Sequence, residues 1–424
     1  MRPTRGSRPS GGHGAPLIAP SRALRLLLTR TKPMPVIEVP LAEALGRVVA
    51  RAIRAPHDLP RFASSAMDGY AVASAATRSA TRRTPARLRL VGRTIFAGGS
   101  PGPAVGDGAA IRIMTGAPLP RGVDAVVPQE EVLVTGRALE LARPSGRGRH
   151  VRRSGGDCSR GDRVVTPGEP IHPGTLALLA ALGIRRIRVR RPPRITLVVT
   201  GDEVRPPSTR AIPRYATRDC HATFLTAALG EFGIAPRSVA YARDSERALR
   251  QTLSAALARA DLVIATGGVS VGDRDLVRPV LRSLGARTIF WRVAQRPGKP
   301  LYFGRRRSAA VLGLPGNPAS TVVCYCEYVR PAILRMLGAS DAAPERWWVR
   351  LSSAVRRDPV RTGFIRGRLE RHDLEWRARP SSRQGSNLLG SFLESDCVIL
   401  VPPGRGSLRA GARVRVHALP WWRA

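Results

Sequence analysis

The stretch DLVIATGGVSVGDRD, residues 261–275, places a run of apolar residues directly before a turn rich in glycine and aspartate. A short apolar run bounded by turn residues is typical of a strand buried in a sheet. Gly267 and Gly268 carry no side chain, so backbone N–H groups can come close to a bound anion there. The aspartates could instead hold a metal ion, and a plain surface turn is the third alternative.

The neighbouring segments repeat this pattern. Two further apolar runs that end in marked turns are RITLVVTGDEV (194–204) and AAVLGLPGNP (309–318). Strands that alternate with helices predict a doubly wound, mostly parallel sheet within residues 192–340. The helices of this domain are expected at 222–233, 247–260, 276–286 and 319–338.

The rest of the chain is predicted to form smaller domains, because 424 residues are too many for one ordinary core. Short strands between glycines and prolines predict an inserted small β-rich domain at 61–146 and a C-terminal β-barrel-like domain at 344–424. An elongated N-terminal domain would combine residues 17–60 and 147–191, with helices at 21–30, 40–50 and 175–183. Residues 1–16 are polar and glycine-rich, which is typical of a disordered tail. The fold class is therefore multidomain α/β, with a central doubly wound domain flanked by β-rich small domains.

The formal net charge of +40 is in the range of proteins that bind nucleic acid. However, Lys32 and Lys299 are the only lysines, so 70 − 2 = 68 of the basic residues are arginines. These arginines are spread along the whole chain. Aromatic residues, which stack on bases, make up only 5%. We therefore expect most of the charge to be solvated surface, with no nucleic-acid partner.

A membrane-spanning protein and a disulfide-stabilised protein are also disfavoured. No uninterrupted apolar stretch approaches the roughly 20 residues of a membrane helix. The five cysteines are widely spaced and lack zinc-ligand spacing, which indicates a reducing compartment.

Ligands of open α/β sheets bind beyond the carboxyl ends of the strands. Carboxylates at such an edge would repel a bare phosphate, unless a hard cation such as Mg²⁺ lies between them. Each turn taken singly is explained as well by a solvated connection, but three turns of one sheet favour a ligand site. The residues brought to this edge are Asp202, Glu203, Gly267, Gly268, Asp273, Asp275, Pro315 and Asn317.

The segment FWRVAQRPGKPLYFG, residues 290–304, adds positive charge. A turn at Pro297–Gly298 could present Arg292, Arg296 and Lys299 together to an oxyanion. An exposed basic loop is the equal alternative.

Seven segments, in this order along the chain, resemble the molybdopterin molybdenumtransferase family (MoeA-type, with the E domain of gephyrin). They are SSAMDGYAV, IRIMTGAPLPRGVDAVVPQEE, VVTGDEV, ATGGVSVGDRD, RPGKPLYFG, GLPGNPAST and QGSNLLGSF. One glycine motif would be weak evidence, whereas seven in order are strong.

The resemblance implies a cytoplasmic enzyme of molybdenum cofactor biosynthesis. Such an enzyme inserts molybdate into adenylylated molybdopterin and releases AMP in a Mg²⁺-dependent reaction. Family members are elongated homodimers, in which the α/β molybdopterin-binding domain of one subunit faces the small β-rich domain of the other. A molybdopterin adenylyltransferase is the implied donor of the substrate.

The resemblance also implies site residues. Glu203, Asp219 and Asp275 match the family's Mg²⁺-binding and catalytic acids, and Asp68 and Thr115 match catalytic residues of the small β-rich domain. The residues that match the pocket for the pterin cofactor are Gly267, Gly268, Ser270, Arg292, Pro315, Asn317, Pro318 and Asp157. Those that match the molybdate pocket are Arg296, Lys299, Arg361 and Ser386.

The chain departs from the family in the loop before Asp219. Arg218 and His221 stand where the family usually has tyrosine and asparagine. This change motivates an alternative function, a non-catalytic member of the family that binds the cofactor or acts as a scaffold.

Overall fold

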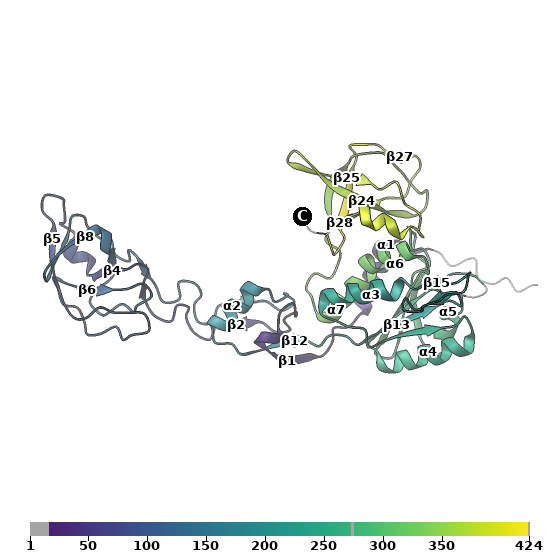
Figure 1. Ribbon diagram of the computed structural model, residues 1–424, viewed down its shortest axis with the longest axis horizontal. Helices are drawn as coiled ribbons and strands as arrows, with labels where there is room; N and C mark the ends of the chain where they lie inside the picture. Colours follow the sequence, from purple (N-terminus) through teal and green to yellow (C-terminus); the bar gives the residue numbers. More distant parts are fainter. Residues whose placement is uncertain (1–16, 273–274, 423–424) are drawn as a thin grey trace, which may run out of the picture.

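The computed structural model describes residues 17–272 and 275–422 (Figure 1). Asp273 and the predicted tail at 1–16 lie outside the described residues. Figure 1 shows an elongated molecule with a β-rich end, a narrow middle part and a wider end that holds the central sheet. The C-terminal strands lie beside this sheet, so the inserted β-rich end is the part farthest from it.

The central sheet has six strands in the order β16-β13-β17-β21-β20-β18. The first four are parallel; β13, β17 and β21 were predicted, whereas β16 was not. β20 runs antiparallel to both of its neighbours, β21 and β18. β18 and β20 were not predicted as strands, because residues 290–304 were interpreted either as a turn that presents cations to an oxyanion or as an exposed basic loop. The strands are β13 (Ile195–Thr200), β16 (Ser238–Ala242), β17 (Leu262–Thr266), β18 (Arg287–Trp291), β20 (Tyr302–Arg306) and β21 (Ala309–Leu314).

Helices cover both faces of this sheet, which confirms the doubly wound prediction. In β17, Leu262 and Ile264 belong to one core, whereas Val263 and Ala265 belong to the other. The first core includes residues of α1 (Pro20–Arg30), α3 (His221–Leu229), α6 (Pro318–Cys324) and α7 (Arg330–Leu337). The second includes residues of α4 (Glu246–Arg259) and α5 (Val277–Ser283).

Two helix predictions need correction. Residues 40–50 form only a 3₁₀ turn, η1 (Leu41–Glu43), because Gly46 has a φ of 71° and the β-branched Val48 and Val49 form bridges with other segments. The long helix predicted at 319–338 is interrupted by a π-helical segment, η5 (Tyr325–Val329), between α6 and α7.

The narrow middle part and its connections consist of short paired strands. β1 (Val36–Pro40) pairs with β12 (Arg186–Arg190), and α2 (Pro173–Ala181) packs beside them. The other short strands on this side of the molecule are β2 (Ile53–Arg54), β3 (Ser64–Ser65), β10 (Val151–Arg152) and β11 (Arg163–Val165). Two short strand pairs belong to the wider end, β14 (Val204–Arg205) with β15 (Thr217–Arg218) and β23 (Val355–Arg356) with β27 (Ser407–Leu408).

The inserted end is a six-stranded sheet in the order β7-β4-β6-β5-β9-β8. Its strands are β4 (Gly69–Val72), β5 (Ala86–Leu90), β6 (Ala109–Ile113), β7 (Ala125–Pro128), β8 (Val132–Thr135) and β9 (Ala138–Leu141). Its 3₁₀ turns are η2 (Ser74–Thr77) and η3 (Gln129–Glu131), whereas η4 (Gly230–Phe232) and η6 (Leu389–Glu394) lie in the wider end.

The C-terminal strands close into a barrel, because β26 pairs with both β28 and β24. β19 pairs with β24 although it belongs to the segment between β18 and β20, so it ties the barrel to the central sheet. The buried Glu327 of η5 contributes to this junction through an ion pair to Arg346 and a close contact with Nε2 of His417 of β28. The strands are β19 (Gln295–Arg296), β22 (Trp347–Leu351), β24 (Thr362–His372), β25 (Glu375–Pro380), β26 (Cys397–Val401) and β28 (Arg413–Ala418).

All five cysteines are free. Within the described ranges, the chain has no helix with the length and apolar character needed to cross a membrane.

Candidate functional site

A cavity of about 240 Å³ lies at the carboxyl ends of β13, β17 and β21. Three turns supply its walls, as the apolar runs predicted. Its lining includes Glu203 after β13, Gly267, Gly268 and Asp275 after β17, and Gly316 after β21. We call this cavity the rim pocket.

The two glycines of the rim pocket are required by their backbone. Gly267 and Gly268 have φ angles of 82° and 64°, which side chains rarely adopt. A Cβ atom on Gly267 would lie 2.7 Å from Oγ1 of Thr200, and one on Gly268 would lie 2.8 Å from Cγ2 of Val277. The N–H of Gly267 was expected to face a bound phosphate. It instead donates to the carbonyl of Leu314 at 3.0 Å and is therefore not available to a ligand.

Two carboxylates in the walls of the rim pocket retain oxygen atoms for a ligand. The Glu203 carboxylate accepts no hydrogen bond from the described residues and is exposed. Asp275 accepts from the N–H of Gly272 through Oδ2 at 2.6 Å, which leaves Oδ1. Asp244 also lines the pocket, and its carboxylate accepts from the N–H of Asp202.

Asp219 has a different environment. It is buried and is not among the residues that line the rim pocket. Oδ1 accepts from the N–H groups of His221 and Ala222 at the start of α3, and Oδ2 accepts from the Tyr241 hydroxyl at 3.0 Å. Burial, together with this hydrogen bond, raises the pKa of Tyr241 to about 12. Asp219 thus fixes the start of α3 to β16.

His221, noted only as a departure from the family, lines the rim pocket. Its Nε2 lies 3.1 Å from the carbonyl of Gly316, and because a carbonyl only accepts, Nε2 carries the proton. Burial lowers the pKa of His221, although Asp219 and the Gly316 carbonyl oppose this effect. The ring is therefore neutral near pH 7 and Nδ1 is an acceptor. Nδ1 has no partner among the described residues.

The predicted molybdate residues gather where the C-terminal barrel meets the central sheet. In the register of β19 and β24, Arg296 lies opposite Gly363. Arg361 precedes Gly363 by two residues, so it lies near Arg296 at the start of β24. Nδ2 of Asn317 donates to Oγ of Ser386 at 3.1 Å, so the turn after β21 touches the QGSN loop. Arg361 forms a 2.6 Å ion pair with Asp358, a partner that the sequence did not indicate.

The other predicted pocket residues are distributed around these loops. Lys299 is half-buried, and its carbonyl accepts from the N–H of Val293. The Arg292 guanidinium lies 5.5 Å from the centroid of the Trp291 ring. Ser270 is exposed in the turn after β17, the Pro315 carbonyl accepts from the Thr321 hydroxyl, and Pro318 is the first residue of α6.

Asp68 and Thr115 lie together in the inserted β-rich end. Oδ1 of Asp68 accepts from both the N–H and the hydroxyl of Thr115, each at 2.7 Å. These two hydrogen bonds lower the pKa of Asp68. Within one chain they are far from the rim pocket (Figure 1). Asp157 is exposed in the connection between the two ends, where its N–H donates to the carbonyl of Leu59.

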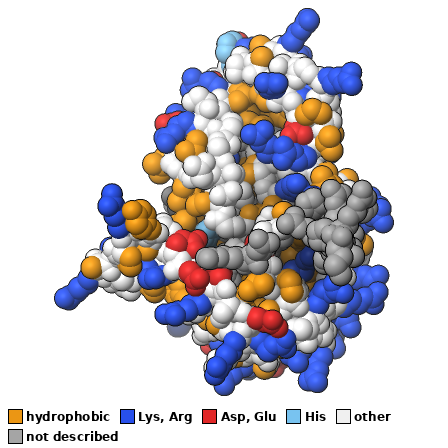
Figure 2. Space-filling model, turned by 90° about the vertical axis from the view of Figure 1, so that its right-hand side faces the viewer, with side chains coloured by type: hydrophobic (Ala, Val, Ile, Leu, Met, Phe, Trp, Pro, Cys, Tyr) orange, Lys and Arg blue, Asp and Glu red, His pale blue; other side chains and the backbone are white. Residues whose placement is uncertain are grey.

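Acidic side chains are scarce on the wide end of the molecule. On the face shown in Figure 2, lysine and arginine side chains predominate; one group of acidic side chains lies near the centre, and a few others lie apart from it. Among the described residues, no three His, Cys, Asp or Glu side chains are placed to hold a metal ion by themselves. A cation here would need ligands from a bound substrate as well.

Three family models match successive parts of the chain. Residues 18–183 match the MoeA N-terminal region (domain I and II), residues 196–335 match a probable molybdopterin binding domain, and residues 349–419 match the MoeA C-terminal region (domain IV).

Curated proteins are similar over nearly the full length. A molybdopterin molybdenumtransferase of Synechococcus elongatus is 33% identical over 95% of this chain and 100% of its own length. A molybdopterin molybdenumtransferase of Haemophilus influenzae is 34% identical over 89% of this chain and 92% of its own length.

Solved structures agree. Two structures of the molybdopterin biosynthesis MoeA protein from Pyrococcus horikoshii superpose with TM-scores of 0.83 and 0.82. They are 30% and 27% identical and cover 96% and 95% of this chain, in each case with 100% of the solved chain.

Proposed function

Because this chain belongs to the MoeA family of molybdopterin molybdenumtransferases, we propose that it inserts molybdate into adenylylated molybdopterin and releases AMP. It is a transferase of molybdenum cofactor biosynthesis. The observation that carries the proposal is the rim pocket, in which carboxylates and a glycine turn meet at the carboxyl edge of the sheet.

The donor set of the rim pocket fits a magnesium ion. Mg²⁺ is commonly held by one or two carboxylates together with substrate phosphates and water. Glu203 and Asp275 both line the pocket and both keep free carboxylate oxygens. The ion, when bound, would neutralise charge on the phosphoanhydride that is cleaved.

The family resemblance also implied that Asp219 is a metal ligand. Both of its oxygens are engaged by protein donors, so we assign it a positioning role instead. It holds the start of α3, and with it His221, against the rim pocket. His221 would then present a neutral acceptor to the substrate.

Arg296, Lys299, Arg361 and Ser386 would bind molybdate, a dianion that guanidinium and ammonium groups attract. The contact between Asn317 and Ser386 supports this proposal, because it links the turn after β21, which lines the rim pocket, to the QGSN loop that contains Ser386. Asp358 would orient Arg361 for this purpose.

We further propose that the enzyme is a cytoplasmic homodimer. Asp68 and Thr115 cannot reach the rim pocket of their own chain, and a second subunit could supply them. A molybdopterin adenylyltransferase would deliver the substrate.

The test is a turnover assay with adenylylated molybdopterin, Mg²⁺ and either molybdate or tungstate. The wild-type chain should release AMP and form active cofactor. Glu203→Gln should lower the rate by about 100-fold or more, because it removes a charge beside the reacting phosphates. The control is Asp202→Asn, the same change at the neighbouring residue, which does not line the pocket.

If the wild-type chain binds the cofactor tightly but releases no AMP, the scaffold alternative is correct. The observation that favours this alternative is the changed loop, with Arg218 and His221 in place of the usual tyrosine and asparagine. In the structure, the Arg218 guanidinium is bonded to carbonyls of its own loop, including that of Pro207 at 3.0 Å.

A further inference from the structure

A second cavity, of about 570 Å³, lies at the opposite edge of the central sheet. Its lining comes from the segment after α1, from the connection between β12 and β13, and from the residues that precede β17 and β21. The rim pocket lies beyond the carboxyl ends of the same strands, so the two cavities are separate. We call the second one the basal pocket.

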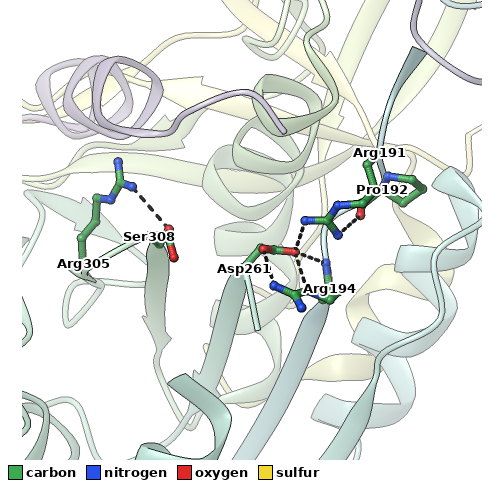
Figure 3. Close-up of polar contacts among 6 residues, drawn as sticks. All are labelled: Arg191, Pro192, Arg194, Asp261, Arg305 and Ser308. Atoms are coloured by element: carbon green, nitrogen blue, oxygen red, sulfur yellow. Dashed lines mark hydrogen bonds and ion pairs between the residues drawn. The ribbon is translucent and has the colours of Figure 1, made fainter. Parts of the chain in front are cut away.

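Asp261 arranges two arginines in the wall of the basal pocket. Figure 3 shows Arg191 and Arg194 pointing toward its carboxylate. Arg194 donates from its backbone N–H, Nε and Nη2, and Arg191 donates from Nη2 at 2.9 Å. Burial alone would raise the pKa of Asp261, but the hydrogen bonds from Arg194 and Arg191 hold it below its ordinary value. The carboxylate therefore stays charged and the two guanidinium groups are held in place.

The remaining cations of the basal pocket lack a carboxylate partner in the described part of the chain. The Arg305 guanidinium donates to the carbonyl of Arg30 and to that of Ser308, and Figure 3 shows the second of these hydrogen bonds. Lys32 and Arg307 form no ion pair within residues 17–272 and 275–422. Five cations and one carboxylate line the cavity, which gives an excess of 5 − 1 = +4.

The lining also contains an unsatisfied hydroxyl and apolar side chains. Thr31 is only 3% exposed, and its Oγ1 has no hydrogen-bond partner among the described residues. Burying a polar group without a partner is costly, so a ligand atom at this position would relieve that cost. Met34, Met336 and Pro33 provide apolar surface beside the cations.

We propose that the basal pocket binds a phosphorylated organic anion at a site separate from the substrate pocket. Guanidinium groups bind phosphate oxygens in pairs, and arginines already fixed by Asp261 lose little freedom when they do so. The methionines and the proline contact the organic part. A net charge of +4 in one concave site distinguishes it from the scattered arginines of the surface.

The test is calorimetric titration of the full chain with ADP near 0.15 M salt, without divalent metal or molybdate. The variant Lys32→Ala/Arg307→Ala removes two exposed cations of the pocket. The control Arg82→Ala/Arg83→Ala removes two exposed, unpaired cations from the inserted β-rich end. The pocket variant should bind ADP about tenfold more weakly or worse, and the control should match the wild type. Equal weakening in both variants, or no weakening in either, overturns the proposal.

Two further arms sharpen the assignment. Thr31→Val should weaken ADP binding a few-fold while the free protein stays at least as stable, because the unsatisfied hydroxyl is removed. Inorganic phosphate should bind at least about tenfold more weakly than ADP, because it cannot use the apolar wall. Phosphate binding as tight as that of ADP would show that no organic part is recognised. The readout is binding alone, so it stands apart from the turnover assay.

Discussion

At the scale of single residues, Asp219 and Glu203 were assigned to one site, but their surroundings differ. Asp219 accepts from two N–H groups of α3 and from Tyr241, whereas Glu203 is exposed without such partners. We predict that Asp219→Ala lowers the free energy of unfolding by about 1–3 kcal/mol, because it removes a helix cap and leaves donors unpaired. Glu203→Gln should change it by less than about 0.5 kcal/mol. Urea unfolding measures both.

The variant Tyr241→Phe removes one of the three donors to Asp219. Its loss in free energy of unfolding should lie between those of Glu203→Gln and Asp219→Ala. Unfolding curves of Asp219→Ala that coincide with the wild type would contradict the positioning role and return Asp219 to the chemistry.

The Asp358 carboxylate, which is paired with Arg361, should make the free energy of unfolding depend on pH. Hydrogen bonds from Arg361 lower its pKa to about 2, below the ordinary value of 3.8, although burial opposes the shift. A carboxyl whose pKa is depressed in the folded state stabilises it above the unfolded-state value, and this stabilisation is lost as the pH falls. We predict that wild type exceeds Asp358→Asn in stability by a constant amount above about pH 5. The difference should shrink between about pH 4 and pH 2, as followed by urea unfolding at each pH.

Sequence reasoning at this scale succeeded where a residue follows directly on a strand. Glu203, Gly267 and Asp275 were placed together because parallel strands end at one edge. The burial of Asp219 could not be predicted, because Tyr241 comes from a different strand and meets it only in the folded chain. The ion pair between Asp358 and Arg361 was missed for another reason, since a spacing of three residues in a loop carries no pairing signal.

At the scale of elements, the turn after β17 depends on close backbone packing. Gly267 and Gly285 have the same φ of 82°, but a Cβ atom would clash with Thr200 only at Gly267, and Gly285 has open space around it. We predict that Gly285→Ala costs about 1 kcal/mol through backbone strain alone, whereas Gly267→Ala costs at least about 2 kcal/mol more. Thermal unfolding of the two variants compares them directly. Equal losses would mean that the close approach to Thr200 is unimportant.

The elements themselves were predictable to different degrees. Three of the four parallel strands, β13, β17 and β21, and the flanking helices followed from apolar runs and helical spacing, whereas β16 was not predicted. β18 and β20 did not, because their arginines and aromatics resemble an exposed loop until β20 pairs with β21 and β18 pairs with β20. The 40–50 segment has helical spacing, yet Gly46 and tertiary pairing of Val48 and Val49 override it.

At the scale of the whole molecule, the separation between the β-rich end and the rim pocket leads to the last prediction. If the proposed dimer builds each site from Glu203 of one subunit and Asp68 of the other, two inactive variants should complement each other. In a heterodimer of Glu203→Gln and Asp68→Ala, one site carries both changes and the other carries none.

An equal, fully exchanged mixture of these two variants should therefore regain about a quarter of the wild-type AMP-release activity, because half of the dimers have one intact site of two. The matched control mixes Asp68→Ala with Thr115→Ala. Both changes lie in the β-rich end, so every site of that heterodimer is damaged and activity should stay low. Thermal unfolding of each variant excludes loss of folding as the cause. Absence of rescue in the first mixture, with heterodimers demonstrated by differently tagged subunits, would place the complete site within one chain.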